Sequence, residues 1–161
     1  MDNKQYITIE NARIFSRNFQ GLPTAYNPRG GQRTCCVALT PDMAQSLMEQ
    51  GFNVKVSKPR EGYEDQGDAY YLPLEIKFEP VPPKVFLITN GIRKILDEKT
   101  VKCLDYANIT RVDLTINPYH WEVNGNHGVK AYIKTLAVTQ LVDPIEEMYY
   151  DIPESAANTE A

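Results

Sequence analysis

Two short stretches of the chain place basic and aromatic side chains in alternation, and these residue types have the clearest chemistry. Arginine and phenylalanine alternate from Arg13 to Phe19, and lysine and tyrosine alternate from Lys130 to Lys134. Side chains two apart on a strand share a face, so each stretch predicts a surface that is both cationic and aromatic. Cations pair with phosphates, and aromatic rings stack on unpaired bases. The two stretches therefore favour a binding surface for single-stranded nucleic acid.

Neighbouring segments supply further candidates for this surface. Tyr26 and Arg29 lie in a loop over residues 20–32 that contains glycine and proline, and long loops on rigid sheets often carry function. Trp121, beside Tyr119, could stack on a base or equally fill the core. The predicted nucleic-acid-binding residues are Arg13, Phe15, Arg17, Phe19, Tyr26, Arg29, Arg33, Tyr71, Lys77, Tyr119, Trp121, Lys130, Tyr132 and Lys134.

The charge of the chain is distributed unevenly. All 17 Lys and Arg lie in residues 1–142 together with 15 Asp and Glu, whereas residues 143–161 hold six acids and no base. We therefore expect one domain over residues 1–142 and an acidic, disordered tail over residues 143–161. Such a tail could compete weakly with nucleic acid for the basic surface or recruit other proteins.

The cysteines and the apolar segments restrict the class of protein. Cys35, Cys36 and Cys103 lack the spacing of a metal site, and adjacent cysteines cannot easily share a disulfide, so we expect reduced thiols. No segment reaches the about 18 apolar residues that cross a bilayer, and no signal-type run precedes the first strand. We expect a cytosolic protein that binds no membrane.

The first half of the sequence predicts strands around one helix. Residues 6–19 read as one long strand with a bend near Asn11, where the phase of the apolar residues changes. Residues 33–39 form a second strand, and a short helix follows that Thr40 caps and Gly51 ends. The apolar residues of segment 71–78 alternate, although Pro73 makes a central strand less favourable there.

The second half ends in a long hairpin. Residues 84–88 predict a short strand, and residues 92–104 have apolar spacing compatible with a helix. Residues 109–123 and 128–142 alternate around Asn124-Gly125, which is typical of a hairpin turn. This order predicts a mainly β fold: an OB-fold-like, five-stranded antiparallel barrel with inserted short helices and a long C-terminal β-hairpin.

Several segments resemble a known family. The segments are Tyr71–Lys77, Val112–Tyr119, Trp121–Gly125 and Gly128–Lys134. They resemble bacteriophage single-stranded DNA-binding proteins of OB fold. The resemblance implies binding of single-stranded DNA without sequence specificity, during phage replication or recombination in the host cytoplasm. The tail departs from the familiar bacterial pattern, because it continues to Glu160-Ala161 without a terminal Phe. Replication or recombination proteins are a separate expectation for partners of the acidic tail, and an oligomer is possible.

Two other functions remain to be weighed. A phage protein-binding module that inhibits or recruits a host enzyme would use the same aromatic residues as interface anchors. His120 and His127 near Asn124 faintly suggest a nuclease, but that chemistry needs a metal-binding helix after the hairpin, where the sequence predicts a strand. We expect a protein that is not an enzyme, with no catalytic residue, no metal and no cofactor.

Overall fold

Strands make up about half of the structure, a computed structural model that describes residues 5–141. The predicted acidic tail, residues 143–161, lies outside the described residues. The elements in chain order are β1 (Ile7–Ile9), β2 (Ile14–Asn18), β3 (Arg33–Leu39), α1 (Pro41–Glu49), β4 (Lys55–Ser57), the 3₁₀ helix η1 (Glu64–Gln66), β5 (Ala69–Ile76), β6 (Lys84–Thr89), β7 (Ile92–Leu96), the 3₁₀ helix η2 (Val101–Asp105), β8 (Ile109–Val123) and β9 (Asn126–Gln140).

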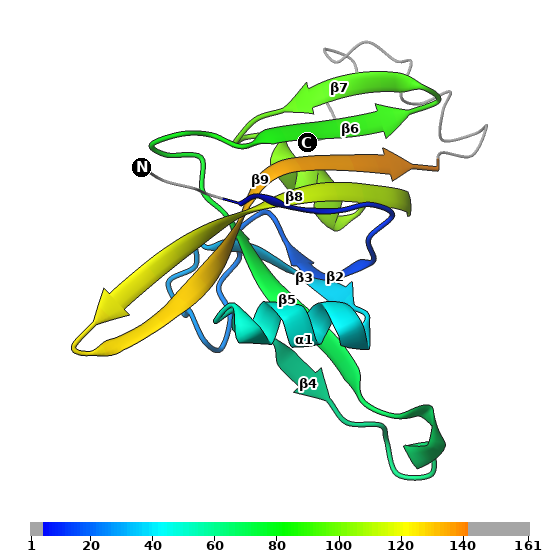
Figure 1. Ribbon diagram of the computed structural model, residues 1–161. Coiled ribbons are helices and arrows are strands. Elements are labelled where there is room, and N and C mark those ends of the chain that lie inside the picture. The colour runs from blue at the N-terminus through cyan, green and yellow to red at the C-terminus, as the bar shows by residue number, and fades with distance from the viewer. Residues whose placement is uncertain (1–4, 142–161) are drawn as a thin grey trace.

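The strands of residues 5–141 form one mixed sheet. Its main path runs β1-β8-β9-β5-β3-β2, with β4 paired to β5, β6 paired to β9, and β7 paired to β6. Figure 1 shows β6 and β9 running in the same direction, and β5 also pairs with β9 in parallel. The predicted mainly β class is confirmed. The sheet differs from the expected five antiparallel strands in having nine strands and two parallel pairings.

The β8–β9 hairpin supplies much of the core. Its turn is Asn124-Gly125, where both residues have positive φ, as a tight two-residue hairpin turn requires. The predicted inward residues are buried on both strands: Val112, Leu114 and Ile116 of β8, and Val129, Ala131 and Ile133 of β9. Alternate residues of β9 must therefore point to the opposite face.

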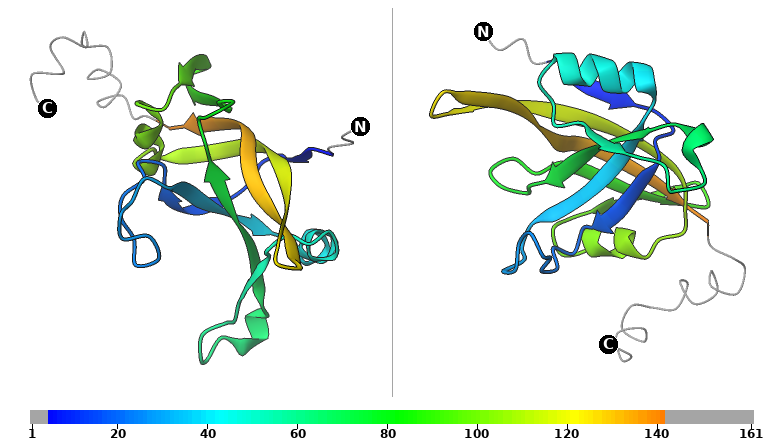
Figure 2. Two further views of the ribbon diagram at one scale, coloured as in Figure 1. Left: turned by 90° about the vertical axis from the view of Figure 1, so that its left-hand side faces the viewer. Right: turned by 90° about the horizontal axis from the view of Figure 1, so that it is seen from below.

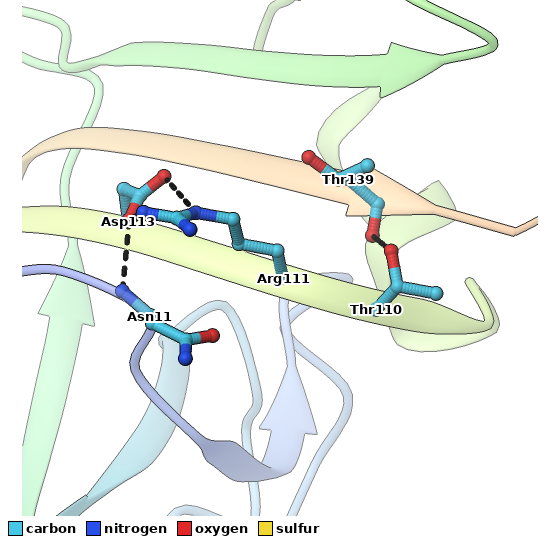
Figure 3. A network of polar contacts seen from close by, with 5 residues as sticks. All are labelled: Asn11, Thr110, Arg111, Asp113 and Thr139. Carbon is cyan, nitrogen blue, oxygen red and sulfur yellow. Dashed lines mark hydrogen bonds and ion pairs between the residues drawn. The ribbon is translucent and has the colours of Figure 1, made fainter.

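A polar contact holds the bend at Asn11, which divides the predicted long strand into β1 and β2. Asn11 has a φ of 51°, and its backbone N–H donates to Oδ1 of Asp113 at 2.8 Å. Nε of Arg111 lies 3.0 Å from Asp113 Oδ2, and Thr110 donates to the Thr139 carbonyl on the neighbouring strand (Figure 3). The bend lets β1 pair with β8 while β2 pairs with β3.

Replacing Asp113 by alanine should lower the melting temperature at neutral pH. The Arg111 side chain, and then the Asn11 N–H, hold the pKa of Asp113 below the ordinary value of 3.8. A carboxyl whose pKa is lower in the folded state stabilises the fold above its unfolded pKa, and this contribution disappears as pH falls through the folded pKa. The melting-temperature difference between wild type and Asp113→Ala should therefore shrink below pH 3.8. The control is Glu122→Gln, a change at an exposed carboxylate of the β8–β9 hairpin that should leave the melting temperature at neutral pH nearly unchanged.

The predicted helix over residues 92–104 is wrong in its first part. Residues 92–96 form β7, which pairs with β6 through a turn at Asn90-Gly91, where both residues have positive φ. Ile92 and Ile95 are each 73% exposed, so their spacing does not mark a buried helical stripe. The second part forms only η2. The predicted cap of α1 is confirmed, because Thr40 Oγ1 accepts the Met43 N–H at 3.2 Å.

Candidate nucleic-acid interface

One outer face of the sheet collects most of the predicted binding residues. On β9, the residues that alternate with buried Val129, Ala131 and Ile133 point away from the core. Trp121 lies opposite Gly128, and Tyr119 lies opposite Lys130, so both share this face. We call this surface the aromatic face; its residues are Phe15, Tyr71, Lys77, Tyr119, Trp121, Lys130, Tyr132 and Lys134.

Rings and lysines contact one another across this face. Tyr119 and Tyr132 meet edge to face with ring centroids 6.0 Å apart, and Phe15 and Tyr71 do so at 5.4 Å. The amino group of Lys77 lies 5.3 Å from the centre of the Tyr132 ring. Tyr119 is 54% exposed. Flat rings are thus accessible beside positive charge, which is what a base and its phosphate need.

Trp121 lies against the backbone of Gly128 across the hairpin. A Cβ atom on Gly128 would come within 2.8 Å of the indole Cζ2, so only glycine lets the ring take this position. The indole borders a groove of about 430 Å³ that Phe52 and Pro73 also line. Trp121 is 38% exposed, so it stands at a groove margin and is not a core residue.

Glu75 neutralises one cation of the aromatic face. Its carboxylate forms an ion pair with Lys130 and accepts a hydrogen bond from Gln32 at 3.0 Å. Burial acts to lower the pKa of Lys130, but the hydrogen bond and charge of Glu75 outweigh it, and the pKa is raised. Lys130 is therefore charged but already paired. The sequence predicts that Glu75 points outward. Glu75 does lie on the outward face, but it is buried there, where it contacts the side chains of Lys130 and Gln32.

Lys134 occupies an irregular position at the end of the aromatic face. The pairing of β8 with β9 passes from Ile116–Ile133 to Thr115–Thr135, so Lys134 is the extra residue of a bulge. Its amino group lies 4.1 Å from the centre of the Tyr6 ring. Tyr6 is 47% exposed and was not among the predicted residues. Its alternation with the apolar residues Ile7 and Ile9 could have suggested an outward position.

Two residues of the first stretch belong to the fold and not to the surface. Phe19 is fully buried, and Arg17 donates to the carbonyls of Leu104 and Ala107 at 2.7 and 2.9 Å. The cause is Ser16, whose φ of 52° accompanies a register shift between β2 and β3. The alternation thus stops after Phe15. The predicted outward orientation of Phe19 is wrong, and Arg17 anchors the end of η2 and the residues after it.

Of the remaining candidates, Arg33, Tyr26 and Arg29 lie apart from the aromatic face. Arg13 lies two residues before Phe15 and borders the aromatic face, because its carbonyl accepts the Ala38 N–H at 2.9 Å and so continues the pairing with β3. Arg33 points with buried Cys35 toward the core side, where it pairs with Glu98 at 3.7 Å. Arg13 is exposed and lines a different hollow with Arg17. Tyr26, which is 99% exposed, and the exposed Arg29 lie in the loop over residues 20–32. Figure 2 (left) shows this loop and the β8–β9 hairpin on opposite sides of β5.

Residues 5–141 contain no cluster of three or more His, Cys, Asp or Glu that could hold a metal ion. His120 and His127 are exposed on the β8–β9 hairpin, and strand follows them. No helix among the described residues is both long and apolar enough to cross a membrane.

The comparisons identify the family. Residues 2–161 match the family model described as "Putative phage ssDNA-binding domain", and the chain belongs to this family. The fold is similar to the single-stranded DNA-binding protein from bacteriophage Enc34 with a C-terminal truncation, at TM-score 0.53 and 13% identity over 86% of this chain and 87% of that chain. The Enc34 protein in complex with ssDNA gives TM-score 0.51 and 13% identity over 86% and 88%. A search of curated proteins found no match.

Proposed function

We propose that the aromatic face is the site where this phage protein binds single-stranded DNA, without sequence specificity. The observation that carries the proposal is the gathering of five aromatic residues and three lysines on one outer face. Bases would stack on the exposed rings, and phosphates would pair with the lysines beside them. Stacking tolerates every base, so the site needs no base-specific hydrogen bonds. The role requires no catalysis, and its place would be the cytoplasm of the infected host.

We also propose that the sheet path is an OB-fold barrel. The two ends of the sheet path are β1 and β2, which follow each other directly in the chain. At one end β1 pairs with β8, and at the other end β2 pairs with β3. Counting β1 and β2 as two halves of one strand gives a ring of five, with β4, β6 and β7 as additions. In an OB fold, ligands lie beside the loop after the first strand and the loop of the last hairpin. Here these are residues 20–32 and the Asn124-Gly125 turn.

The salt dependence of binding should be moderate. Lys77 and Lys134 are exposed on the aromatic face, whereas Lys130 forms an ion pair with Glu75. With about two phosphates contacted, the slope of log affinity against log salt should be roughly −1.4 for single strands. Titration of oligo-dT at several salt concentrations measures this slope, and Trp121, the single tryptophan, reports binding by quenching. No quenching together with a slope near zero would contradict the proposed site.

Gly128→Ala tests the position of Trp121 on this face. The added Cβ would lie 2.8 Å from Cζ2, so the indole must move, while Gly128 itself needs no positive φ. We expect a severalfold loss of oligo-dT affinity, because stacking is worth about 1 to 3 kcal/mol per base. The control is Trp121→Phe, which keeps a ring and should lose less. Unchanged affinity and an unchanged tryptophan spectrum in Gly128→Ala would show that this contact does not matter.

A further inference from the structure

A second groove lies away from the aromatic face, between the β6–β7 hairpin and η2. It has a volume of about 900 Å³. Leu96 is buried at its base, and three exposed lysines border it, namely Lys94, Lys99 and Lys102. Tyr106, which is 80% exposed, also lines it. We call it the lysine groove.

The lysine groove repeats the chemistry of the aromatic face. The accessible ring of Tyr106 stands among positive charges, and Ile92, which is 73% exposed, adds apolar surface. Within residues 5–141, none of the three lysines forms an ion pair. Phosphates pair with such cations, and a base can stack on such a ring. The groove therefore suits a single strand of nucleic acid.

The carboxylates near these lysines already have partners. Asp97 accepts backbone N–H groups of its own turn, and Asp105 accepts two from the residues after β2. Glu98 pairs with Arg33 at 3.7 Å. The three lysines are thus the unpaired charges of the groove, and they are available to a polyanion.

A second hollow joins the lysine groove to the end of β5. This hollow, of about 720 Å³, shares Lys99 and Lys102 with the lysine groove and reaches Arg33. The guanidinium carbon of Arg33 lies 5.6 Å from the centre of the Phe78 ring. Phe78 directly follows Lys77, a cation of the aromatic face. Cations therefore follow one another from the aromatic face, past the end of β5, to the lysine groove.

We propose that single-stranded DNA continues from the aromatic face around the end of β5 into the lysine groove. The inference rests on the proposed function and extends it to a second surface. Phosphates pair with the three lysines, and a base stacks on Tyr106. One OB fold covers about 4 to 16 nucleotides, so a single copy of the chain can contact both surfaces. An acidic protein segment would also complement the lysines, but the continuity with the aromatic face favours nucleic acid.

The first experiment compares oligo-dT of about 6 and about 16 nucleotides, near the two ends of this range. Trp121 lies on the aromatic face and reports the binding of both by quenching. The short strand covers the aromatic face alone, so its slope of log affinity against log salt should be roughly −1.4. The long strand should give roughly −3.5, because three further phosphates are contacted.

The two possible failures differ. Quenching by both strands with equal slopes would overturn the extension into the lysine groove while leaving the aromatic face as the binding site. No quenching by either strand would refute the aromatic face itself, and the extension with it.

A charge-matched pair of double variants separates the groove from net charge. Lys99→Gln with Lys102→Gln removes the two cations that both hollows share. It should flatten the slope for the long strand by about 1.4 and leave the short strand unaffected. Lys58→Gln with Arg60→Gln removes the same charge from the exposed loop between β4 and β5, and should change neither slope. Equal effects of the two double variants on the long strand would overturn the proposal.

Cys103 reports on the groove without relying on affinity. It lines the lysine groove and is exposed, whereas Cys35 is buried. Alkylation by iodoacetamide, mapped by peptide mass spectrometry, should slow severalfold at Cys103 when the long strand saturates the wild-type protein, and should not change with the short strand. Unchanged alkylation with the long strand would assign the groove to another ligand, such as an acidic protein segment, and would overturn the proposal.

Discussion

Phe19→Ala should lower the free energy of unfolding by about 3 to 5 kcal/mol, as truncation of a fully buried phenylalanine does. Phe19 is completely inaccessible to solvent, and its backbone N–H donates to Asp105 at 2.7 Å. The buried ring thus packs in the core, while the backbone N–H links the residue after β2 to the last residue of η2. Small domains are stable by only about 5 to 15 kcal/mol, so this is a large fraction of the total. Urea denaturation measures the change.

Phe15→Ala is the matched control, since the two residues belong to the same sequence stretch. Phe15 is 36% exposed and contacts Tyr71 on the aromatic face. Its loss should change stability by about 1 kcal/mol or less but weaken oligo-dT binding by about 1 to 3 kcal/mol. If Phe19→Ala were as stable as the wild type but bound DNA more weakly, Phe19 would be a surface residue that binds DNA and not a core residue.

The sequence predicts those parts of the fold whose signals are local. The alternation over 109–123 and the Asn124-Gly125 turn give β8 and its turn correctly, and Thr40 gives the start of α1. The β6–β7 hairpin was missed because Ile92 and Ile95 have helical spacing while facing solvent. The second Asn-Gly pair, at Asn90-Gly91, was the available signal. The parallel pairing of β9 with β5 and β6 joins distant segments and has no local pattern.

The candidate site is also predicted where its sequence signal is local and missed where it depends on pairing between distant segments. On β9 the period of two holds from the turn to the bulge at Lys134, and the predicted outward residues share one face. On β2 the period fails at Ser16, because a serine with positive φ has no sequence signature. The pairing of Glu75 with Lys130 depends on where β5 meets β9, which only the three-dimensional register fixes. Counting the Lys and Arg residues of the sequence therefore overestimates the number of positive charges that are free to pair with phosphates.

Tyr132→Ala should weaken oligo-dT binding by about 1 to 3 kcal/mol, or about 5- to 150-fold, the range for loss of one stacked base. Tyr132 is the centre of the aromatic face: its ring meets Tyr119 at 6.0 Å, and the amino groups of Lys77 and Lys130 each lie 5.3 Å from its centre. Removing it takes away a stacking surface and the positioning of two cations. The salt slope should therefore change together with the affinity.

Tyr63→Ala provides the comparison for this last variant. Tyr63 is 54% exposed but lies before η1, on the loop between β4 and β5, away from the aromatic face. Its loss should leave affinity and salt slope unchanged, which would assign the effect of Tyr132 to its position and not to aromatic content. Both proteins should unfold at similar urea concentrations, since neither ring is fully buried. Equal losses of affinity in the two variants would mean that DNA contacts the protein through rings scattered over its surface.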